Sequence, residues 1–67
     1  MPSATARILR HLAKSRCSYI DDLRRVVKRY GYSEKSIYTY ISRLKKMGAI
    51  EKRRINGKRI ICIDIDS

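Results

Sequence analysis

The chain has 67 residues and carries 17 lysines and arginines against 6 acidic residues, which gives a formal net charge of +11 at pH 7. A chain this short forms one domain, residues 1–67, and so large an excess of cations indicates a polyanionic partner. No run approaches the roughly 18 to 20 apolar residues of a membrane span, and no signal peptide opens the chain. We therefore expect an intracellular, cytoplasmic protein.

The residue inventory argues against an enzyme or a metalloprotein. His11 is the one histidine, and Cys17 and Cys62 lie far apart, without the paired spacing that holds a metal ion. The carboxylate pairs fit the positive end of a helix and a solvated chain end better than a catalytic dyad; they are Asp21 with Asp22, and Asp64 with Asp66. We predict no catalysis, no metal, no cofactor and no small-molecule effector.

The first helix is predicted over residues 4–14, with Ser3 as its N-cap. Apolar and polar side chains separate along it. The apolar side contains Ile8, Leu9, Leu12 and Ala13, and the opposite side contains Arg7, Arg10, His11 and Lys14. We expect the first side to enter the core and the second to face solvent or phosphate, with His11 as a surface imidazole.

The second helix is predicted to begin at Ser18-Tyr19-Ile20-Asp21, which fits the capping box in which a serine and an acidic residue satisfy free amides of the first turn. Its apolar positions recur at steps of three and four: Ile20, Leu23, Val26, Val27 and Tyr30. Gly31 can take the left-handed conformation that ends a helix, so we expect the helix to stop near Tyr30.

A third helix follows after only three residues. Ser33 is its predicted N-cap and Gly48 its stop, and its apolar positions are Ile37, Tyr40, Ile41, Leu44 and Met47. A connection this short makes two helices cross at a large angle, which is the geometry of a helix-turn-helix unit. Residues 33–47 are then the reading helix.

The outward face of this third helix is rich in hydroxyls and cations. It contains Lys35, Thr39, Ser42 and Lys46, with Tyr38 and Arg43 on its flanks. Such groups bind base edges and phosphates, and small side chains let a helix sit deep in a groove. The alternative is an ordinary solvated face, but on this helix no acidic residue follows Glu34 to balance these charges.

A hairpin is predicted over residues 49–66, because Asn56-Gly57 is a strong type I′ turn signal between two alternating segments. A two-residue loop pairs Ile55 with Lys58 and therefore Ile50 with Ile63. The residues expected to face the helices are Ile50, Ile61, Ile63 and Ile65, and those crowding the tip are Lys52, Arg53, Arg54, Lys58 and Arg59. Cations on paired strands repel one another without an anion, so we favour a phosphate or groove contact over a tip charged for solubility.

The order of these elements resembles the winged helix-turn-helix family of transcription regulators, an α+β fold of three helices and a two- to three-stranded antiparallel wing. The likeness rests on residues 31–65, above all on the helix ending Arg43-Leu44-Lys45-Lys46-Met47-Gly48-Ala49-Ile50. It implies that the third helix enters the major groove through Lys35, Ser36, Tyr38, Thr39, Ser42 and Arg43. It also implies that the wing contacts DNA through Arg53, Arg54, Asn56, Lys58 and Arg59.

The resemblance further implies a short strand over residues 16–18 that pairs with the last strand. This pairing could bring Cys17 near Cys62. We expect two reduced thiols, because intracellular cysteines are usually reduced and cysteine is a good small core residue, with a disulfide as the alternative.

The function predicted from these features is sequence-specific regulation of transcription on double-stranded DNA. Similar regulators bind two half-sites as a symmetric pair, so we expect a homodimer, for which Ile60 and Cys62 are candidate contact residues. The alternatives are a non-specific nucleic-acid binder, chromatin-like or for RNA, and a winged helix that docks proteins. The absence of glutamine and tryptophan is compatible with a thermophile, and the size is similar to regulators of archaea and their viruses and plasmids.

Overall fold

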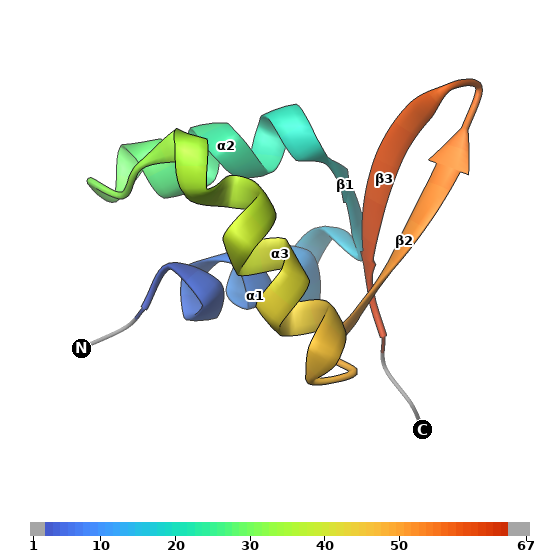
Figure 1. Ribbon diagram of the computed structural model, residues 1–67, viewed down its shortest axis with the longest axis horizontal. Helices are drawn as coiled ribbons and strands as arrows, with labels where there is room; N and C mark the ends of the chain where they lie inside the picture. The colour runs from blue at the N-terminus through green and yellow to red at the C-terminus, as the bar shows by residue number, and fades with distance from the viewer. Residues whose placement is uncertain (1–2, 65–67) are drawn as a thin grey trace.

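The computed structural model describes residues 3–64, in which three helices pack on one side of a small antiparallel sheet (Figure 1). The elements in chain order are α1 (Ala4–Ser15), β1 (Cys17–Tyr19), α2 (Ile20–Arg29), the 3-10 helix η1 (Glu34–Ser36), α3 (Ile37–Lys46), β2 (Ile50–Ile55) and β3 (Lys58–Ile63). The predicted α+β winged helix-turn-helix fold is confirmed.

Strand β3 is the centre of the sheet, whose order is β1-β3-β2. The hairpin register is as predicted, with Ile50 opposite Ile63 and Ile55 opposite Lys58. Asn56 and Gly57 both have positive φ, 52° and 78°, as a type I′ turn requires. The short strand implied by the family resemblance also exists, one residue further along the chain than expected. The wing therefore has three strands at its base and two at its tip.

Glycines end both helices of the helix-turn-helix unit. At the end of α2, the amide of Tyr32 donates to the carbonyl of Val27 at 2.9 Å, across Gly31 at φ 85°. At the end of α3, the amide of Ala49 donates to the carbonyl of Leu44 at 3.0 Å, across Gly48 at φ 75°. Both are Schellman motifs, which need a residue with positive φ and so favour glycine. The predicted helix stops are thus confirmed.

Helix starts were predicted less well. The Ser3 hydroxyl caps α1 by accepting from the amide of Ala6 at 3.2 Å, as expected. The predicted capping box at Ser18 is wrong, because Ser18 is taken into β1 opposite Ile61, and the N-cap of α2 is Tyr19. Ser33 precedes η1 without a side-chain cap, so the predicted third helix opens with a 3-10 turn before α3.

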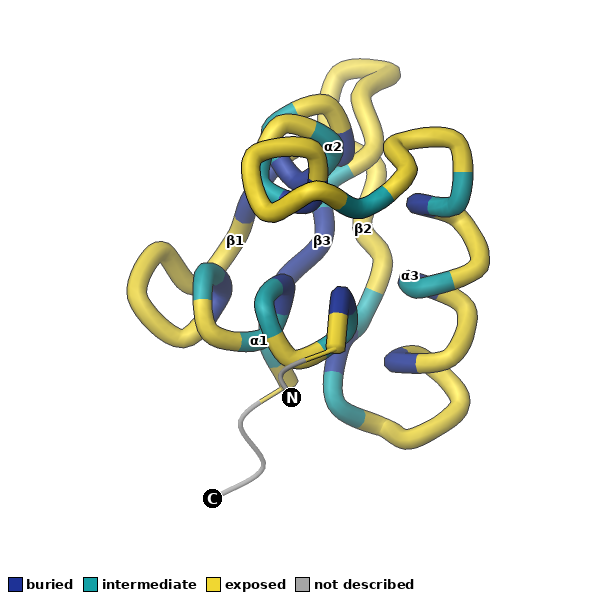
Figure 2. Tube along the Cα trace, turned by 90° about the vertical axis from the view of Figure 1, so that its left-hand side faces the viewer, coloured by how far each residue is buried: buried dark blue, intermediate teal, exposed yellow. Residues whose placement is uncertain are grey.

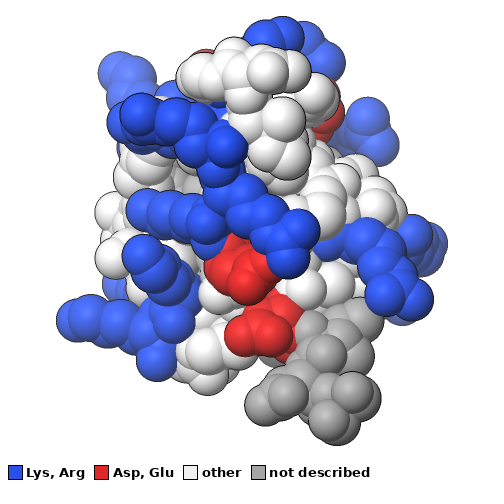
Figure 3. Space-filling model, turned by 90° about the vertical axis from the view of Figure 1, so that its right-hand side faces the viewer, with Lys and Arg blue, Asp and Glu red and all other residues white. Residues whose placement is uncertain are grey.

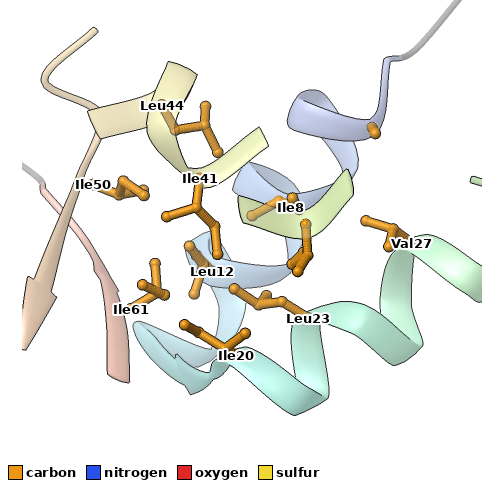
Figure 4. Packing of buried hydrophobic residues seen from close by; sticks show 11 residues of the cluster. Ile8, Leu12, Ile20, Leu23, Val27, Ile41, Leu44, Ile50 and Ile61 are labelled. Carbon is orange, nitrogen blue, oxygen red and sulfur yellow. The ribbon is translucent and has the colours of Figure 1, made fainter. Parts of the chain in front are cut away.

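The three α-helices and the two strands of the hairpin contribute to one apolar cluster (Figure 4). Its fully buried members with the largest side chains are Ile8, Leu12, Leu23, Ile37, Ile41, Leu44, Ile61 and Val27. Burial of an aliphatic side chain of this size contributes roughly 1.5 to 3 kcal/mol, so the cluster is the main source of stability in so small a domain. It also fixes which side of each helix is left exposed (Figure 2).

Three residues expected in the core lie at the surface: Ala13, Tyr30 and Met47. Met47 is 72% exposed because it is the C-cap of α3, beyond the last turn that packs on the sheet. Tyr30 is 49% exposed because α2 ends before it, and its ring is covered instead by the guanidinium of Arg7 at 4.0 Å. Ile65 lies outside the described residues.

The structure joins the two cysteines, so the expectation of reduced thiols is wrong. Strands β1 and β3 place Cys17 directly opposite Cys62, with Cα atoms 4.0 Å apart, and the two form a disulfide. This separation lies within the limit of about 7 Å beyond which two cysteines cannot be bridged. The bond ties the connection between α1 and α2 to the base of the wing and closes a loop over a sequence separation of 45 residues.

Reduction should therefore destabilise the domain. For a loop of this length, loss of the cross-link is expected to lower the free energy of unfolding by about 2 to 4 kcal/mol, chiefly because the unfolded chain gains conformational freedom. Urea unfolding with and without a reductant measures the difference. The matched control is Cys17→Ala/Cys62→Ala, whose unfolding midpoint should not respond to reductant. Two titratable thiols in the unfolded, unreduced protein would contradict the disulfide.

Candidate nucleic-acid interface

The exposed face of α3 gathers most of the helix residues predicted to bind DNA. A shallow hollow of about 370 Å³ runs along it, lined by Tyr38, Thr39, Ser42, Arg43 and Lys46. Lys35 is exposed on η1, just before the hollow, whereas Ser36 is half-buried. Five of the helix residues predicted to bind DNA therefore lie together on one surface.

This surface follows from the burial of the opposite side of α3. Ile37, Ile41 and Leu44 are fully buried against α1, α2 and the sheet. At about 100° per residue, these three positions turn Thr39, Ser42 and Lys46 outward. The residues that could touch a ligand are thus fixed by the residues that hold the helix in place.

Apart from Tyr38, the polar side chains of this face are not engaged by other residues of the described part of the chain. Lys35, Thr39, Ser42, Arg43 and Lys46 make no side-chain hydrogen bond or ion pair with any residue of the 3–64 range. The positive charges of Lys35, Arg43 and Lys46 therefore form no ion pair with a carboxylate of the described residues. Donors left free on a rigid helix can bind an external acceptor without first breaking an internal bond.

Tyr38 differs from its neighbours because it lies between α2 and the wing. Its hydroxyl accepts a hydrogen bond from Nη2 of Arg24 at 3.1 Å, and its ring lies 5.4 Å from the Arg24 guanidinium carbon. The Arg59 guanidinium approaches the same ring at 5.8 Å. A residue predicted to read bases thus also connects the reading helix to α2 and to the wing.

The wing cations are divided between two faces of the hairpin. Side chains alternate along a strand and paired residues share a face. Lys52, Arg54 and Arg59 share the inner face with Ile61, which packs on the helices, whereas Arg53 and Lys58 lie on the outer face. On that outer face Arg53 pairs with Glu51, and the Lys58 ammonium lies 5.5 Å from the ring of Tyr19. Figure 3 shows cations around a small acidic area on this side of the molecule.

Of the inner-face wing cations, Arg59 lies beside α3, as its contact with Tyr38 shows. Asn56 is exposed at the turn. The predicted wing residues are therefore not equivalent. Arg54 and Arg59 lie on the face of the hairpin that packs on the helices. Arg53 and Lys58 lie on the opposite face.

A larger cleft of about 580 Å³ separates the wing from the start of α2. It is lined by Tyr19, Ile20, Asp21, Asp22, Arg25, Tyr38, Gly57, Lys58 and Arg59. Both aspartates form an ion pair with the arginine three residues further along α2: Asp21 with Arg24 at 2.7 Å, and Asp22 with Arg25 at 3.3 Å. Two carboxylates on its wall make this cleft a poorer place for phosphate than the hollow on α3, which has none.

Sequence reasoning missed one residue of this surface, Arg24, and named Lys52 among the tip cations without including it among the implied DNA contacts. The alternation of the hairpin, with its register, is enough to place Lys52 beside Arg54, so that residue could have been included. Arg24 carries no such signal, because its contact with Tyr38 depends on the crossing of α2 and α3.

Within residues 3–64, no three His, Cys, Asp or Glu side chains gather as metal ligands would, and none of the helices is long and apolar enough to cross a membrane.

Comparison with known proteins gives one family and one solved structure. The family described as the MCM protein C-terminal winged helix-turn-helix domain matches residues 5–59, which run from α1 into β3. The solved structure is Stf76 from the Sulfolobus islandicus plasmid-virus pSSVx, with a TM-score of 0.73 and 22% sequence identity over 97% of this chain and 86% of that one. At this identity the likeness shows a shared fold. No curated protein matched the chain.

The contacts of Tyr38 lead to a test of its structural contribution. Tyr38→Phe keeps the ring under Arg24 and Arg59 and removes one exposed hydrogen bond, so it should lower the free energy of unfolding by less than about 1 kcal/mol. Tyr38→Ala also removes both cation–ring contacts and should cost about 1 to 2 kcal/mol more. Urea unfolding measures both, and Thr39→Ala, at an unengaged neighbour, should stay within about 0.5 kcal/mol of the wild type. Equal losses in the Phe and Ala variants would show that the ring contacts contribute nothing.

Proposed function

The chain belongs to the family of MCM C-terminal winged helix-turn-helix domains, and on that premise we propose that it binds double-stranded DNA sequence-specifically and regulates transcription by occupying a promoter. In helix-turn-helix proteins the second helix of the unit lies in the major groove, and here that helix is α3. The proposal depends on one observation above all. The exposed face of α3 carries free hydroxyls and cations, and no carboxylate.

The chemistry of this face matches what the major groove presents. Arginine binds guanine O6 and N7 in a bidentate manner, and threonine offers both a hydroxyl and a methyl group. Arg43 and Thr39 lie side by side in the hollow on α3 and carry these two groups. Lys35 and Lys46 lie towards the two ends of the face, where they are placed to contact the flanking phosphates.

The wing supplies the second contact. Arg54, Arg59 and Asn56 extend the cationic surface beyond α3 towards an adjacent groove or backbone, with Lys52 on the same face. Arg53 and Lys58, on the other face of the hairpin, reach DNA only where the tip is inserted between the two walls of a groove. Tyr38 holds Arg59 beside α3, so the helix and the wing act as one surface.

A reading helix contacts only a few base pairs, so we infer that two copies bind two half-sites. The described residues do not single out a dimer surface. Cys62 is buried by the disulfide and by its position in the sheet, which removes it from the candidate contact residues, while Ile60 remains half-exposed on the outer face.

Selection of bound duplexes from a random pool tests the proposal. We expect a consensus of two inverted half-sites spaced by about one or two turns of DNA, and a complex of two protomers by mass. Binding to the selected site should be about 10³-fold or more tighter than to random duplex at physiological salt. A pool without enrichment would leave a non-specific binder, and an enriched single half-site in a 1:1 complex would exclude the dimer.

Substitutions should separate reading from anchoring. Arg43→Ala and Arg54→Ala each remove one positive charge, so they are matched controls for one another. Arg43→Ala or Thr39→Ala should cost about 1 to 3 kcal/mol on the selected site alone and relax one or two base positions. Arg54→Ala should weaken selected and random duplexes by a similar factor and lower the salt slope by about one.

The reverse result would exchange these roles. If Arg54→Ala changed the preferred sequence while Arg43→Ala and Thr39→Ala weakened all duplexes equally, the wing would be the reader and α3 the anchor.

A further inference from the structure

A second cationic surface lies outside the interface described above. It is a groove of about 310 Å³ between α1 and the end of α2, lined by Arg7, Arg10, His11, Lys14, Val26, Arg29 and Tyr30, and we name it the α1–α2 groove. Four of the seven residues are permanent cations and none is acidic. No residue of α3 or of the wing lines it, so it is a separate surface of the molecule.

The cations of this groove form an ordered stripe. Arg7, Arg10 and Lys14 follow one another at intervals of three and four residues, so they lie on the same side of α1. At 1.5 Å per residue, the stripe is about 10 Å long. Arg29 faces it from the last turn of α2.

These charges are not compensated within the described part of the chain. The ion pairs formed between residues 3 and 64 involve Arg24, Arg25 and Arg53, and none involves a residue of the α1–α2 groove. The guanidinium of Arg7 is held 4.0 Å from the ring centroid of Tyr30, and its buried Nε has no hydrogen-bond partner. Clustered cations without carboxylates repel one another, so an external anion would stabilise them.

The shape of the groove favours a repeated anion over a single small one. An exposed stripe about 10 Å long can contact several groups in a row, and each strand of DNA presents one phosphate per about 3.4 Å of helix axis. Arg10, Lys14 and Arg29 are all exposed and can reach such a row.

One duplex cannot occupy both surfaces. The groove is built from α1 and α2 alone, whereas the reading surface is built from α3 and the wing, and Figure 2 shows α1 and α3 on different sides of the molecule. The Cα positions span only 28 × 28 × 21 Å, and DNA is stiff over about 150 base pairs. Bending a duplex around so small a body would be strongly unfavourable.

We propose that the α1–α2 groove binds the phosphate backbone of a second DNA segment, so that one protein molecule bridges two duplexes. This inference rests on the proposed function, because the first duplex is the one held by α3 and the wing. Bridging requires no base recognition in the groove, since its cations bind phosphate alone.

A capture experiment tests the bridge. A short random-sequence duplex is fixed to beads and loaded with protein, and a second, fluorescent random duplex is then added. The wild type should retain the fluorescent duplex. The double variant Arg10→Ala/Lys14→Ala should retain at most about one fifth of that amount. Lys28→Ala/Lys45→Ala is the matched control, since it removes two exposed helical lysines that do not line the groove, and it should capture like the wild type.

Binding of a single duplex is measured first, by titration of each variant. If the wild type binds no duplex, the proposed function fails; if it binds one but captures no second, only the α1–α2 groove proposal fails. Equal capture by the two double variants would also overturn the proposal, because the second duplex would then be held without the groove. Loss of capture in the groove variant, with single-duplex affinity equal to that of the control, would support it.

Discussion

Burial of strand β3 is the constraint on which the other parts of the structure depend. β3 lies between β1 and β2, and its Ile61 is fully buried against the helices. Pairing on both edges ties the wing to the connection between α1 and α2, and the Cys17–Cys62 disulfide adds a covalent link at the same point. Because Ile61 and the buried side of α3 share one apolar cluster, the wing and the reading helix are held in a fixed relation.

The distribution of charge follows from the small size of the core. Most of the aliphatic side chains lie in the apolar cluster or pack against it, and the surface is rich in lysine and arginine, with few carboxylates to balance them. The ion pairs of the described residues use Asp21, Asp22 and Glu51, which all lie near the wing or the start of α2. The cations of α3 and of the α1–α2 groove remain unpaired. These are the two surfaces for which we propose DNA as the partner.

The contacts of Tyr38 show how the two halves of the interface are coupled. An exposed tyrosine on a reading helix would ordinarily be a candidate for base contact. Here Arg24 donates a hydrogen bond to the Tyr38 hydroxyl and Arg59 lies against the Tyr38 ring. A change in the position of the wing would therefore alter the surroundings of Tyr38 on α3. In the function proposed above, sequence recognition by α3 and phosphate contact by the wing are therefore physically linked.

The sequence by itself determined the parts of this protein that depend on neighbouring residues. Glycines with positive φ end α2 and α3, and Asn56-Gly57 sets the hairpin register, because these conformations are local preferences of the backbone. Tertiary structure decided what depends on residues distant in the chain. Pairing of β1 with β3 placed Ser18 in a strand, where it does not cap α2, and placed Cys17 opposite Cys62. The crossing of α2 and α3 placed Arg24 beside Tyr38. The α1–α2 groove likewise exists only because two helices pack together. In the sequence, each of these helices shows only an amphipathic pattern, which does not predict a groove.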